Sequence, residues 1–308
     1  MIEAILISLA GLAGLAIGGE LLVRGAVGIA QKLGVSTLFT GLVIVGFATS
    51  MPEMVASVQA ALSGSPGIAW GNIVGSNFAN TLLILGLSAL VMPIALIGTG
   101  RRDAVVALVA TVVLWTIALF GIGAAWIGAV LLALIVVYIV WRYRHPGAAQ
   151  AEALEDGETI VSGWVSALLF GGGLALLIVS GRALVNGAIE LATIFAVPET
   201  VIGLTIVAVG TSLPELAASV AAALRGKSGL AIGNVVGSNI YNILLIGGAT
   251  MTIAPDPLPA DLLPLQFPLL AASALGLLGL LWFAKRITRT VGAVLALIFA
   301  GNVVLVFS

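Results

Sequence analysis

The sequence predicts an all-α polytopic membrane protein with ten transmembrane helices, arranged as two inverted repeats of five helices. Of the 308 residues, 61% are apolar and only 8% are charged, against about 25% charged residues in soluble domains. Breaks in the hydropathy separate ten apolar segments, most of them near the roughly 20 residues that a membrane helix needs. The second half of the chain also repeats the first. Together these observations exclude a soluble globular protein.

Glycine, proline and charged residues separate the ten segments, which lack the alternation typical of barrel strands. The expected helices lie at 2–28, 36–62, 70–93, 103–120, 124–141, 162–188, 199–224, 231–253, 262–284 and 290–307. The one long polar stretch falls between the fifth and the sixth segment. We therefore expect a first repeat at 1–141, a cytoplasmic linker at 142–161 and a second repeat at 162–308.

An internal repeat supports this division of the chain. Residues 41–86 align without a gap to residues 203–248 at an offset of 162, with 28 identities in 46 positions. The matches include Thr, Ser, Pro, Glu, Asn and Gly, which chance similarity between apolar segments does not explain. Five spans is an odd number, so the second copy must be inverted in the membrane, as in many transporters.

The basic residues predict the orientation. Ten of the twelve Lys and Arg residues fall in loops after the odd-numbered spans, and the opposite loops contain none. The positive-inside rule then places both termini outside the cytoplasm. We expect an integral protein of the cell (plasma or inner) membrane, embedded in the lipid bilayer. The net charge of −1 gives no reason to expect nucleic acid as a partner, and we expect the monomer to be functional.

Two glutamates lie inside the second and seventh spans. Glu53 and Glu215 occupy equivalent repeat positions, each within the pattern Thr-Ser-x-Pro-Glu. An ionised carboxylate near the bilayer centre costs at least about 2.5 kcal/mol, so such residues usually serve a function. We interpret the pair as a cation site of charge −2. The structural alternative is a protonated glutamic acid that hydrogen-bonds to a neighbouring helix.

The residues before each glutamate add oxygen atoms to this site. Pro52 and Pro214 cannot donate a backbone hydrogen bond, so nearby carbonyls are freed for a ligand. The hydroxyl groups three and four residues before each glutamate lie on the same helix face; they belong to Thr49, Ser50, Thr211 and Ser212. The alternative for these hydroxyls is a hydrogen bond to a carbonyl one turn earlier.

The third and eighth spans carry polar residues at helical spacing. The pairs four residues apart are Ser76 with Asn80, and Ser238 with Asn242. Bonding between helices is the alternative reading, and it is strongest for Asn72, Asn77, Asn234 and Asn239. The whole set consists of oxygen ligands, which Ca²⁺ and Na⁺ prefer. The chain has no cysteine, and its one histidine, His145, lies in the linker, so we expect neither a soft-metal site nor a cofactor.

At these residues the sequence resembles a known family. The blocks GFATSMPE…GNIVGSNFAN and AVGTSLPE…GNVVGSNIYN look like the two alpha-repeats of the cation/calcium exchanger superfamily, and the chain is most similar to its compact prokaryotic sodium/calcium exchangers. The resemblance implies alternating access, with long first and sixth spans that slide against the other eight. It also implies Ca²⁺ extrusion driven by Na⁺ entry.

The resemblance further implies roles for single residues. Glu53 and Glu215 would be the central ligands of Ca²⁺ and Na⁺, and Asn80 would lie at the middle of the site. The cytoplasmic-side sodium site would comprise Thr49, Ser50 and Ser76, and the external one Thr211, Ser212 and Ser238. Asn242 departs from the pattern, because exchangers of this type often carry Asp there. Two central carboxylates then remain, which leaves the counter-ion open between Na⁺ and H⁺.

We therefore predict a secondary antiporter and not an enzyme. Its expected activity is the exchange of Ca²⁺ for Na⁺; the alternative is a Ca²⁺/H⁺ or K⁺-dependent antiporter of the same fold. A hydrolase acting inside the membrane would need a histidine, a metal cluster or paired aspartates in the spans, which the sequence does not provide. A passive channel is less consistent with two broken, inverted repeats around one site.

Overall fold

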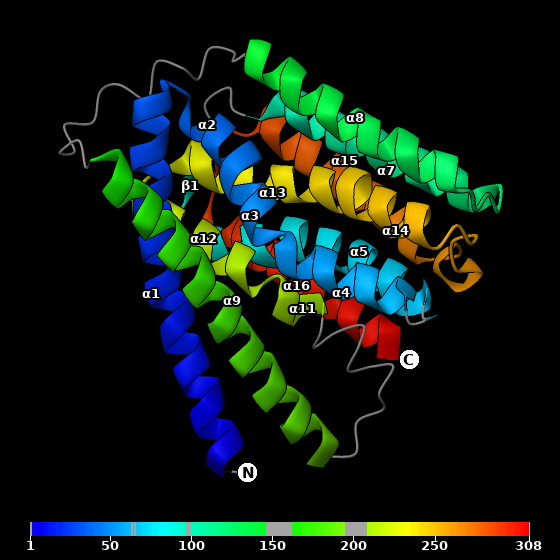
Figure 1. The fold of residues 1–308 in the computed structure, drawn as a ribbon, viewed down its shortest axis with the longest axis horizontal. Helices are drawn as coiled ribbons and strands as arrows, with labels where there is room; N and C mark the ends of the chain where they lie inside the picture. Colours follow the sequence, from blue (N-terminus) through cyan, green and yellow to red (C-terminus); the bar gives the residue numbers. More distant parts are fainter. Residues whose placement is uncertain are drawn as a thin grey trace.

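The structure is a computed structural model, and it describes residues 2–62, 64, 66–96, 100–145, 162–194 and 208–307. The described chain is helical except for turns and one short strand pair (Figure 1). Helices occur in each of the ten apolar segments. The expected linker at 142–161 and the start of the seventh segment lie mostly outside the described residues.

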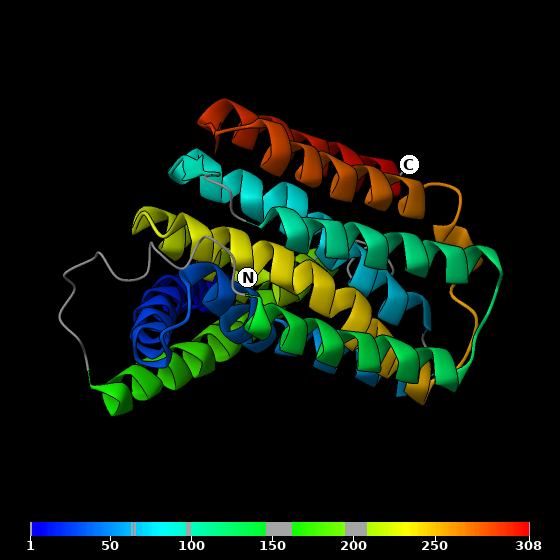
Figure 2. The same ribbon diagram turned by 90° about the horizontal axis from the view of Figure 1, so that it is seen from above.

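Two long helices form an inclined pair at one side of the molecule (Figures 1 and 2). They are α1 (Ile2–Leu33) and α9 (Gly163–Ile194). Glycines on both helices allow the backbones to approach closely: a Cβ built at Gly18 would lie 3.1 Å from the carbonyl oxygen of Gly173. Such small-residue contacts are a common way for membrane helices to associate.

The second and seventh segments are broken in the middle. The second contains α2 (Thr37–Phe39), the π-helix η1 (Thr40–Val45), α3 (Gly46–Thr49) and α4 (Met51–Leu62), with a bend of 42° before α4. The described part of the seventh contains α11 (Ala208–Thr211) and α12 (Leu213–Leu224). Each α-helical break falls one residue before the x-Pro pair, as expected from a proline that lacks an N–H donor.

The third and eighth segments are continuous, and each contains a π-helical turn at its centre. The third consists of α5 (Pro66–Phe78), η2 (Ala79–Ile84) and α6 (Leu85–Val91). The eighth consists of α13 (Ser228–Tyr241), η5 (Asn242–Ile246) and α14 (Gly247–Ile253). Turns of this kind are frequent at functional sites, and here they begin beside or at the asparagines expected in the ion site.

The remaining helices form two hairpins beside this centre. One hairpin consists of α7 (Arg101–Leu119) and α8 (Ala125–Arg144); the other consists of α15 (Gln266–Phe283) and α16 (Arg289–Phe307), preceded by the short turn η6 (Ala260–Leu262). The strands β1 (Ile94–Ala95) and β2 (Arg286–Ile287) pair antiparallel and join the two halves of the chain at one end.

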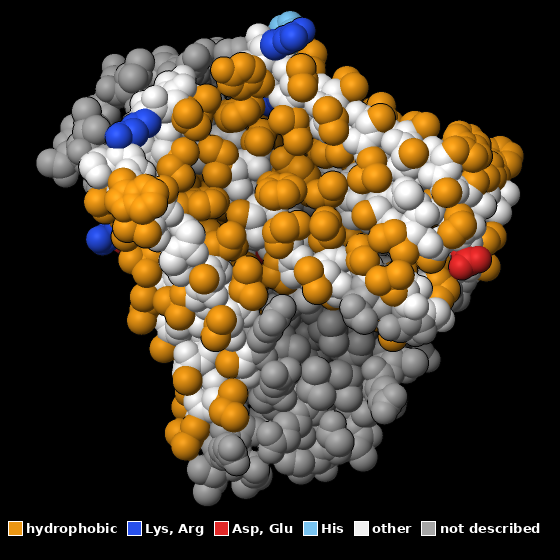
Figure 3. All heavy atoms as spheres, viewed as in Figure 1, with side chains coloured by type: hydrophobic (Ala, Val, Ile, Leu, Met, Phe, Trp, Pro, Cys, Tyr) orange, Lys and Arg blue, Asp and Glu red, His pale blue; other side chains and the backbone are white. Residues whose placement is uncertain are grey.

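The surface of the described chain fits a membrane protein. Six helices in the described part are long and apolar enough to cross a bilayer, and the bent pair around Ser50 would make a seventh. Apolar side chains cover most of the face in Figure 3, and the visible Lys and Arg side chains lie along its upper and left margins. The prediction of an all-α integral membrane protein is confirmed.

Candidate ion site

Glu53 and Glu215 lie in the first turns of α4 and α12, where the broken segments resume. Their side chains are 1% and 0% exposed. The helix breaks at Ser50 and Ser212, whose φ,ψ values of −79°,3° and −85°,5° lie outside the α-helical region. The helix dipole favours negative charge at such N-terminal turns, so the break itself helps to hold a carboxylate in an apolar bundle.

Each half of the chain supplies a hydroxyl group to the glutamate of the other half. Ser50 Oγ donates to Glu215 Oε1 at 3.1 Å, and Ser212 Oγ donates to Glu53 Oε1 at 2.9 Å. These reciprocal bonds bring two carboxylates that are 162 positions apart in the sequence into one buried polar centre.

Several buried polar atoms at the centre have no hydrogen-bond partner in the described protein. They include the second carboxylate oxygen, Oε2, of both glutamates and the side-chain polar atoms of Ser76, Ser238, Asn80 and Asn242. Buried polar groups are nearly always satisfied, and an unpaired one costs about 1–3 kcal/mol. Apart from the two asparagine Nδ2 atoms, these atoms are oxygens at equivalent positions of the two repeats, and such oxygens can coordinate a hard cation.

Thr49 and Thr211 each make the hydrogen bond to a preceding backbone carbonyl that was the alternative to ion binding. Thr49 donates to the carbonyl oxygen of Val45 at 3.0 Å and Thr211 to that of Ala208 at 3.1 Å. Both hydroxyls also reach the asparagine of the opposite half: Thr49 Oγ1 is 3.2 Å from Asn234 Oδ1. Because their hydrogens are used within the protein, only the oxygen lone pairs of the threonines are available to an ion.

Asn72 and Asn234 hold the glutamate-bearing helices in place. Asn234 Nδ2 donates to the backbone carbonyl of Glu215 at 3.1 Å and to Ser219 Oγ at 2.9 Å. Asn72 makes the equivalent bonds to the carbonyl of Glu53 and to Ser57. The interhelical alternative is thus correct for both asparagines. Ser57 and Ser219 are not among the predicted site residues, although they occupy equivalent positions of the repeat.

Glycines allow the two halves to meet at backbone distance. A Cβ built at Gly41 in η1 would lie 2.4 Å from the carbonyl oxygen of Leu230, and one at Gly233 in α13 would lie 2.5 Å from that of Leu38. No side chain fits at either position without movement of the backbone. This close approach carries Asn234 of α13 to within hydrogen-bond distance of Thr49.

The other predicted polar residues have structural partners. Asn77 Nδ2 donates to the carbonyl of Ile73, and Asn239 Nδ2 donates to Thr81 Oγ1. Glu20 and Arg24, four residues apart on α1, pair at 2.8 Å. Glu20 also binds Arg225 at the end of α12, a long-range partner that spacing along one helix could not indicate. His145 is exposed, as expected.

A buried ion pair lies at the end of α8. Arg142, expected in the linker, belongs to the last turn of α8 and is 5% exposed. Its Nε lies 3.0 Å from Asp103 Oδ1, and that oxygen also accepts a hydrogen bond from Tyr138. The helix therefore continues beyond the polar residue that suggested its end, because Asp103 on α7 neutralises the charge.

The predicted ligands at the centre are all oxygen atoms. Among the described residues, no group of three or more His, Cys, Asp or Glu side chains could hold a metal ion. The centre instead combines two carboxylates with neutral hydroxyl and amide oxygens. These are ligands for Ca²⁺ or Na⁺, and neutral oxygens bind more weakly than additional carboxylates.

Comparison with known proteins agrees with this chemistry. The family model described as "Sodium/calcium exchanger protein" matches residues 3–144 and 165–308. A putative antiporter, CaxA, of Alkalimonas amylolytica is 35% identical over the full length of both chains. The sodium/calcium exchanger MaX1 of Methanosarcina acetivorans is 32% identical over 98% of both chains. The solved sodium-calcium exchanger NCX_Mj superposes with a TM-score of 0.85 at 30% identity, over 98% of both chains. The chain therefore belongs to the sodium/calcium exchanger protein family.

Proposed function

We propose that the protein is a secondary active antiporter that exchanges Ca²⁺ for Na⁺ across the membrane by alternating access. The observation that carries the proposal is the pair of buried glutamates, each hydrogen-bonded by a serine of the opposite half. Two ionised carboxylates in an apolar bundle need a neutralising cation, and a charge of −2 matches one Ca²⁺ or two Na⁺. Family membership supports the same activity.

The proposed ion site contains the ten residues predicted from the sequence. Glu53 and Glu215 bind the ion at the centre, and their unpartnered Oε2 atoms are available to it. Neutral oxygens complete the shell; they come from Thr49, Thr211, Ser50, Ser212, Ser76, Ser238, Asn80 and Asn242. Ca²⁺ takes six to eight oxygen ligands, which this set can provide with no resident cofactor.

We propose that Asn80 and Asn242 act as neutral ligands. Both are about 1% exposed, and both atoms of each side-chain amide lack a partner in the described protein. A neutral residue at position 242 keeps the central charge at −2. Charge matching then favours two Na⁺ for one Ca²⁺, and a third Na⁺ would be held by neutral oxygens alone.

We further propose ten transmembrane helices in two inverted repeats, 1–141 and 162–308, joined by a cytoplasmic linker at 142–161. The odd number of spans in each repeat and the reciprocal serine–glutamate bonds support this topology. The excess of Lys and Arg in the loops on one side supports an orientation in the cell membrane with both termini outside the cytoplasm. Single cysteines replacing Ser65 and Asp256 should react with an impermeant thiol reagent from outside intact cells. Cysteines replacing Ala148 and Ser228 should not; the reverse labelling pattern would contradict the orientation.

The counter-ion can be determined in proteoliposomes, where we expect the monomer to be active. ⁴⁵Ca²⁺ uptake is measured under imposed Na⁺, K⁺ or H⁺ gradients with the membrane voltage clamped. We expect an outward Na⁺ gradient alone to drive uptake. Uptake driven by a pH gradient without Na⁺ would support the Ca²⁺/H⁺ alternative, and a requirement for K⁺ together with Na⁺ would support the K⁺-dependent one.

A further inference from the structure

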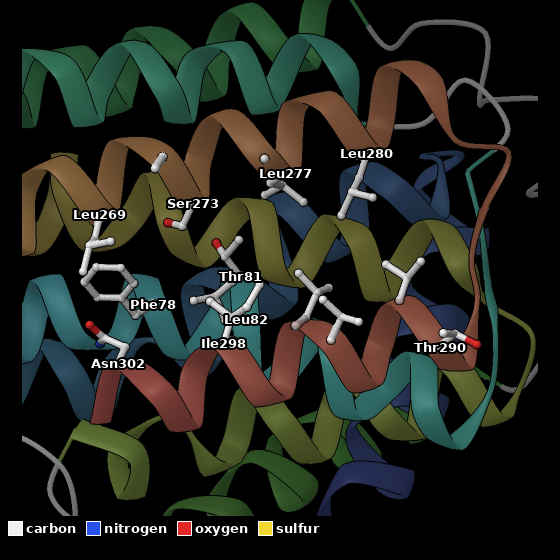
Figure 4. Close-up of a pocket in the computed structure, with 15 residues that line it drawn as sticks. Phe78, Thr81, Leu82, Leu269, Ser273, Leu277, Leu280, Thr290, Ile298 and Asn302 are labelled. Carbon is white, nitrogen blue, oxygen red and sulfur yellow. The ribbon is translucent and has the colours of Figure 1, made fainter. Parts of the chain in front are cut away.

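An apolar groove lies outside the ion site, between α15, α16 and the middle of the third segment. Its volume is about 490 Å³, within the range of about 300–1,000 Å³ typical of small-molecule sites. Leu277 and Leu280 of α15, Ile298 of α16, and Phe78 and Leu82 of the third segment line it (Figure 4). The lining is almost entirely apolar, so the ligand it fits is a hydrocarbon.

The groove exists because the two helices of the hairpin pack on different neighbours. α15 packs on α7, and α16 packs on α6. The contact of α16 is made at backbone distance, since a Cβ built at Gly292 would lie 2.6 Å from the carbonyl oxygen of Gly86. On the α15 side, a Cβ built at Gly276 would have no atom within 4 Å. The space between the helices is therefore left open by the protein itself.

The position of the groove restricts its occupant to a lipid. Apolar side chains on the same two helices face outward around it, including Leu275, which is 58% exposed, and Leu297, which is 70% exposed. Thr290 lies at one end and Asn302 at the other (Figure 4). Twelve residues of helix correspond to about 18 Å, close to the half-thickness of about 15 Å of the bilayer hydrocarbon.

Three basic residues lie in the turn next to the Thr290 end of the groove. Lys285, Arg286 and Arg289 precede Thr290 in the turn between α15 and α16, and all three side chains are exposed. Arg289 also donates to the carbonyl oxygens of Leu90 and Val91, at 3.1 and 3.3 Å, which fixes it beside the third segment. Basic sites between membrane helices bind anionic lipid headgroups.

From the apolar lining, the length and the basic end, we infer that this groove binds one acyl chain of an anionic phospholipid. The chain lies between α15 and α16, and the phosphate of the headgroup lies at Lys285, Arg286 and Arg289. The lipid comes from the leaflet at the basic ends of these helices. Lipid binding in this groove does not require that the proposed transport activity be correct.

The groove also contacts the segment that carries the ion site. Thr81 lines it and accepts the hydrogen bond from Asn239 at 2.8 Å, and the next residue before it is Asn80. Phe78, Thr81 and Leu82 lie in or beside the π-helical turn η2. A bound acyl chain thus packs on the turn that positions Asn80, so occupancy of the groove should also change the rate of exchange.

Lipid binding can be tested by native mass spectrometry of delipidated protein titrated with dioleoyl phosphatidylglycerol or dioleoyl phosphatidylcholine. Gly276→Leu fills the groove. Gly279→Leu is the matched control, because a Cβ there also has no atom within 4 Å and Gly279 is not among the lining residues. We expect Gly276→Leu to weaken binding of the first phosphatidylglycerol by at least about tenfold, with Gly279→Leu like the parent. Replacing Lys285 and Arg286 by Gln should weaken it by about fivefold for each lost charge.

A second measurement does not depend on a large side chain. The chain has no native cysteine, so Gly276→Cys and Gly279→Cys can each carry a single fluorescent label. Brominated phosphatidylglycerol should quench the label at position 276 at lower lipid concentration than the label at position 279. Equal quenching at both positions, unchanged binding in a folded Gly276→Leu protein, or equal affinity of the parent for both lipids would overturn the inference.

Discussion

Replacing either central glutamate by glutamine should weaken the binding of Ca²⁺ more than that of Na⁺. Glu53 is 1% exposed and its Oε2 atom has no partner in the described protein. At an effective dielectric constant of about 20 and a distance of about 4 Å, a carboxylate attracts a divalent ion by about 8 kcal/mol and a monovalent ion by about 4 kcal/mol. Glutamine retains one oxygen ligand but removes this attraction.

Relaxation of the site reduces these values. If the net loss in the glutamine variant is one third of the full attraction, the binding free energy of Ca²⁺ weakens by about 2.7 kcal/mol. This corresponds to about 100-fold for Ca²⁺ and about tenfold for Na⁺. Loss of a ligand without its charge would instead weaken both ions to a similar degree. The ratio of the two effects therefore distinguishes a charge-matched site from one that depends on ligand number.

The assay is ⁴⁵Ca²⁺ uptake into proteoliposomes for Glu53→Gln and Glu215→Gln, together with titration of Ca²⁺ and Na⁺ binding in detergent. Asp256→Asn makes the same chemical change at an exposed position and is the matched control. We expect uptake to be nearly abolished in both glutamate variants and unchanged in the control. Uptake equal to that of the parent in either folded glutamate variant would refute the two-carboxylate site.

Three further predictions follow from the hydrogen bonds and the ion pair. Ser50→Ala and Ser212→Ala should each raise the Ca²⁺ concentration for half-maximal uptake by about tenfold or more, since a hydrogen bond to a charged group contributes about 1.5–3 kcal/mol; a large effect of one serine only would contradict their equivalence. Asn234→Ala should lower stability by about 1–3 kcal/mol by leaving buried partners unpaired, measured by thermal unfolding. Arg142→Met should lower the free energy of unfolding by about 3–5 kcal/mol, and adding Asp103→Asn should restore much of that stability. If the double variant is as unstable as the single one, the unpaired buried charge of Asp103 is not the cause.

The sequence predicted the residues at the centre of the molecule better than the contacts at its periphery, because the motifs of the centre occur in both repeats. Glu53 and Glu215 stood out as charges in apolar spans, and Pro52 and Pro214 indicated the breaks that the described structure contains. The bonds from Ser50 and Ser212 to the opposite glutamate depend on how the two halves pack, which spacing along one helix does not encode. For the same reason the partnership of Glu20 with Arg225 required the structure.

Local polarity was a poor guide at one helix end. Arg142 begins the polar stretch, and its charge suggested solvent, yet it is buried against Asp103 of α7. A residue that is unfavourable in isolation becomes favourable when another helix neutralises it, and a hydropathy profile considers each segment separately. The apolar groove was equally hidden, since the residues that line it come from three segments.

The reciprocal bonds between Ser50, Glu215, Ser212 and Glu53 have a consequence for how this protein could be divided. Each half contains one carboxylate and the hydroxyl group that orients the carboxylate of the other half. Neither half alone contains a complete pair, so a fragment ending at residue 141 and a fragment starting at residue 162 should bind Ca²⁺ only when produced together. Removing the serine hydroxyl from one fragment should then impair the glutamate of the other fragment. Genetic complementation between fragments would therefore test which side chains of the two halves are in contact.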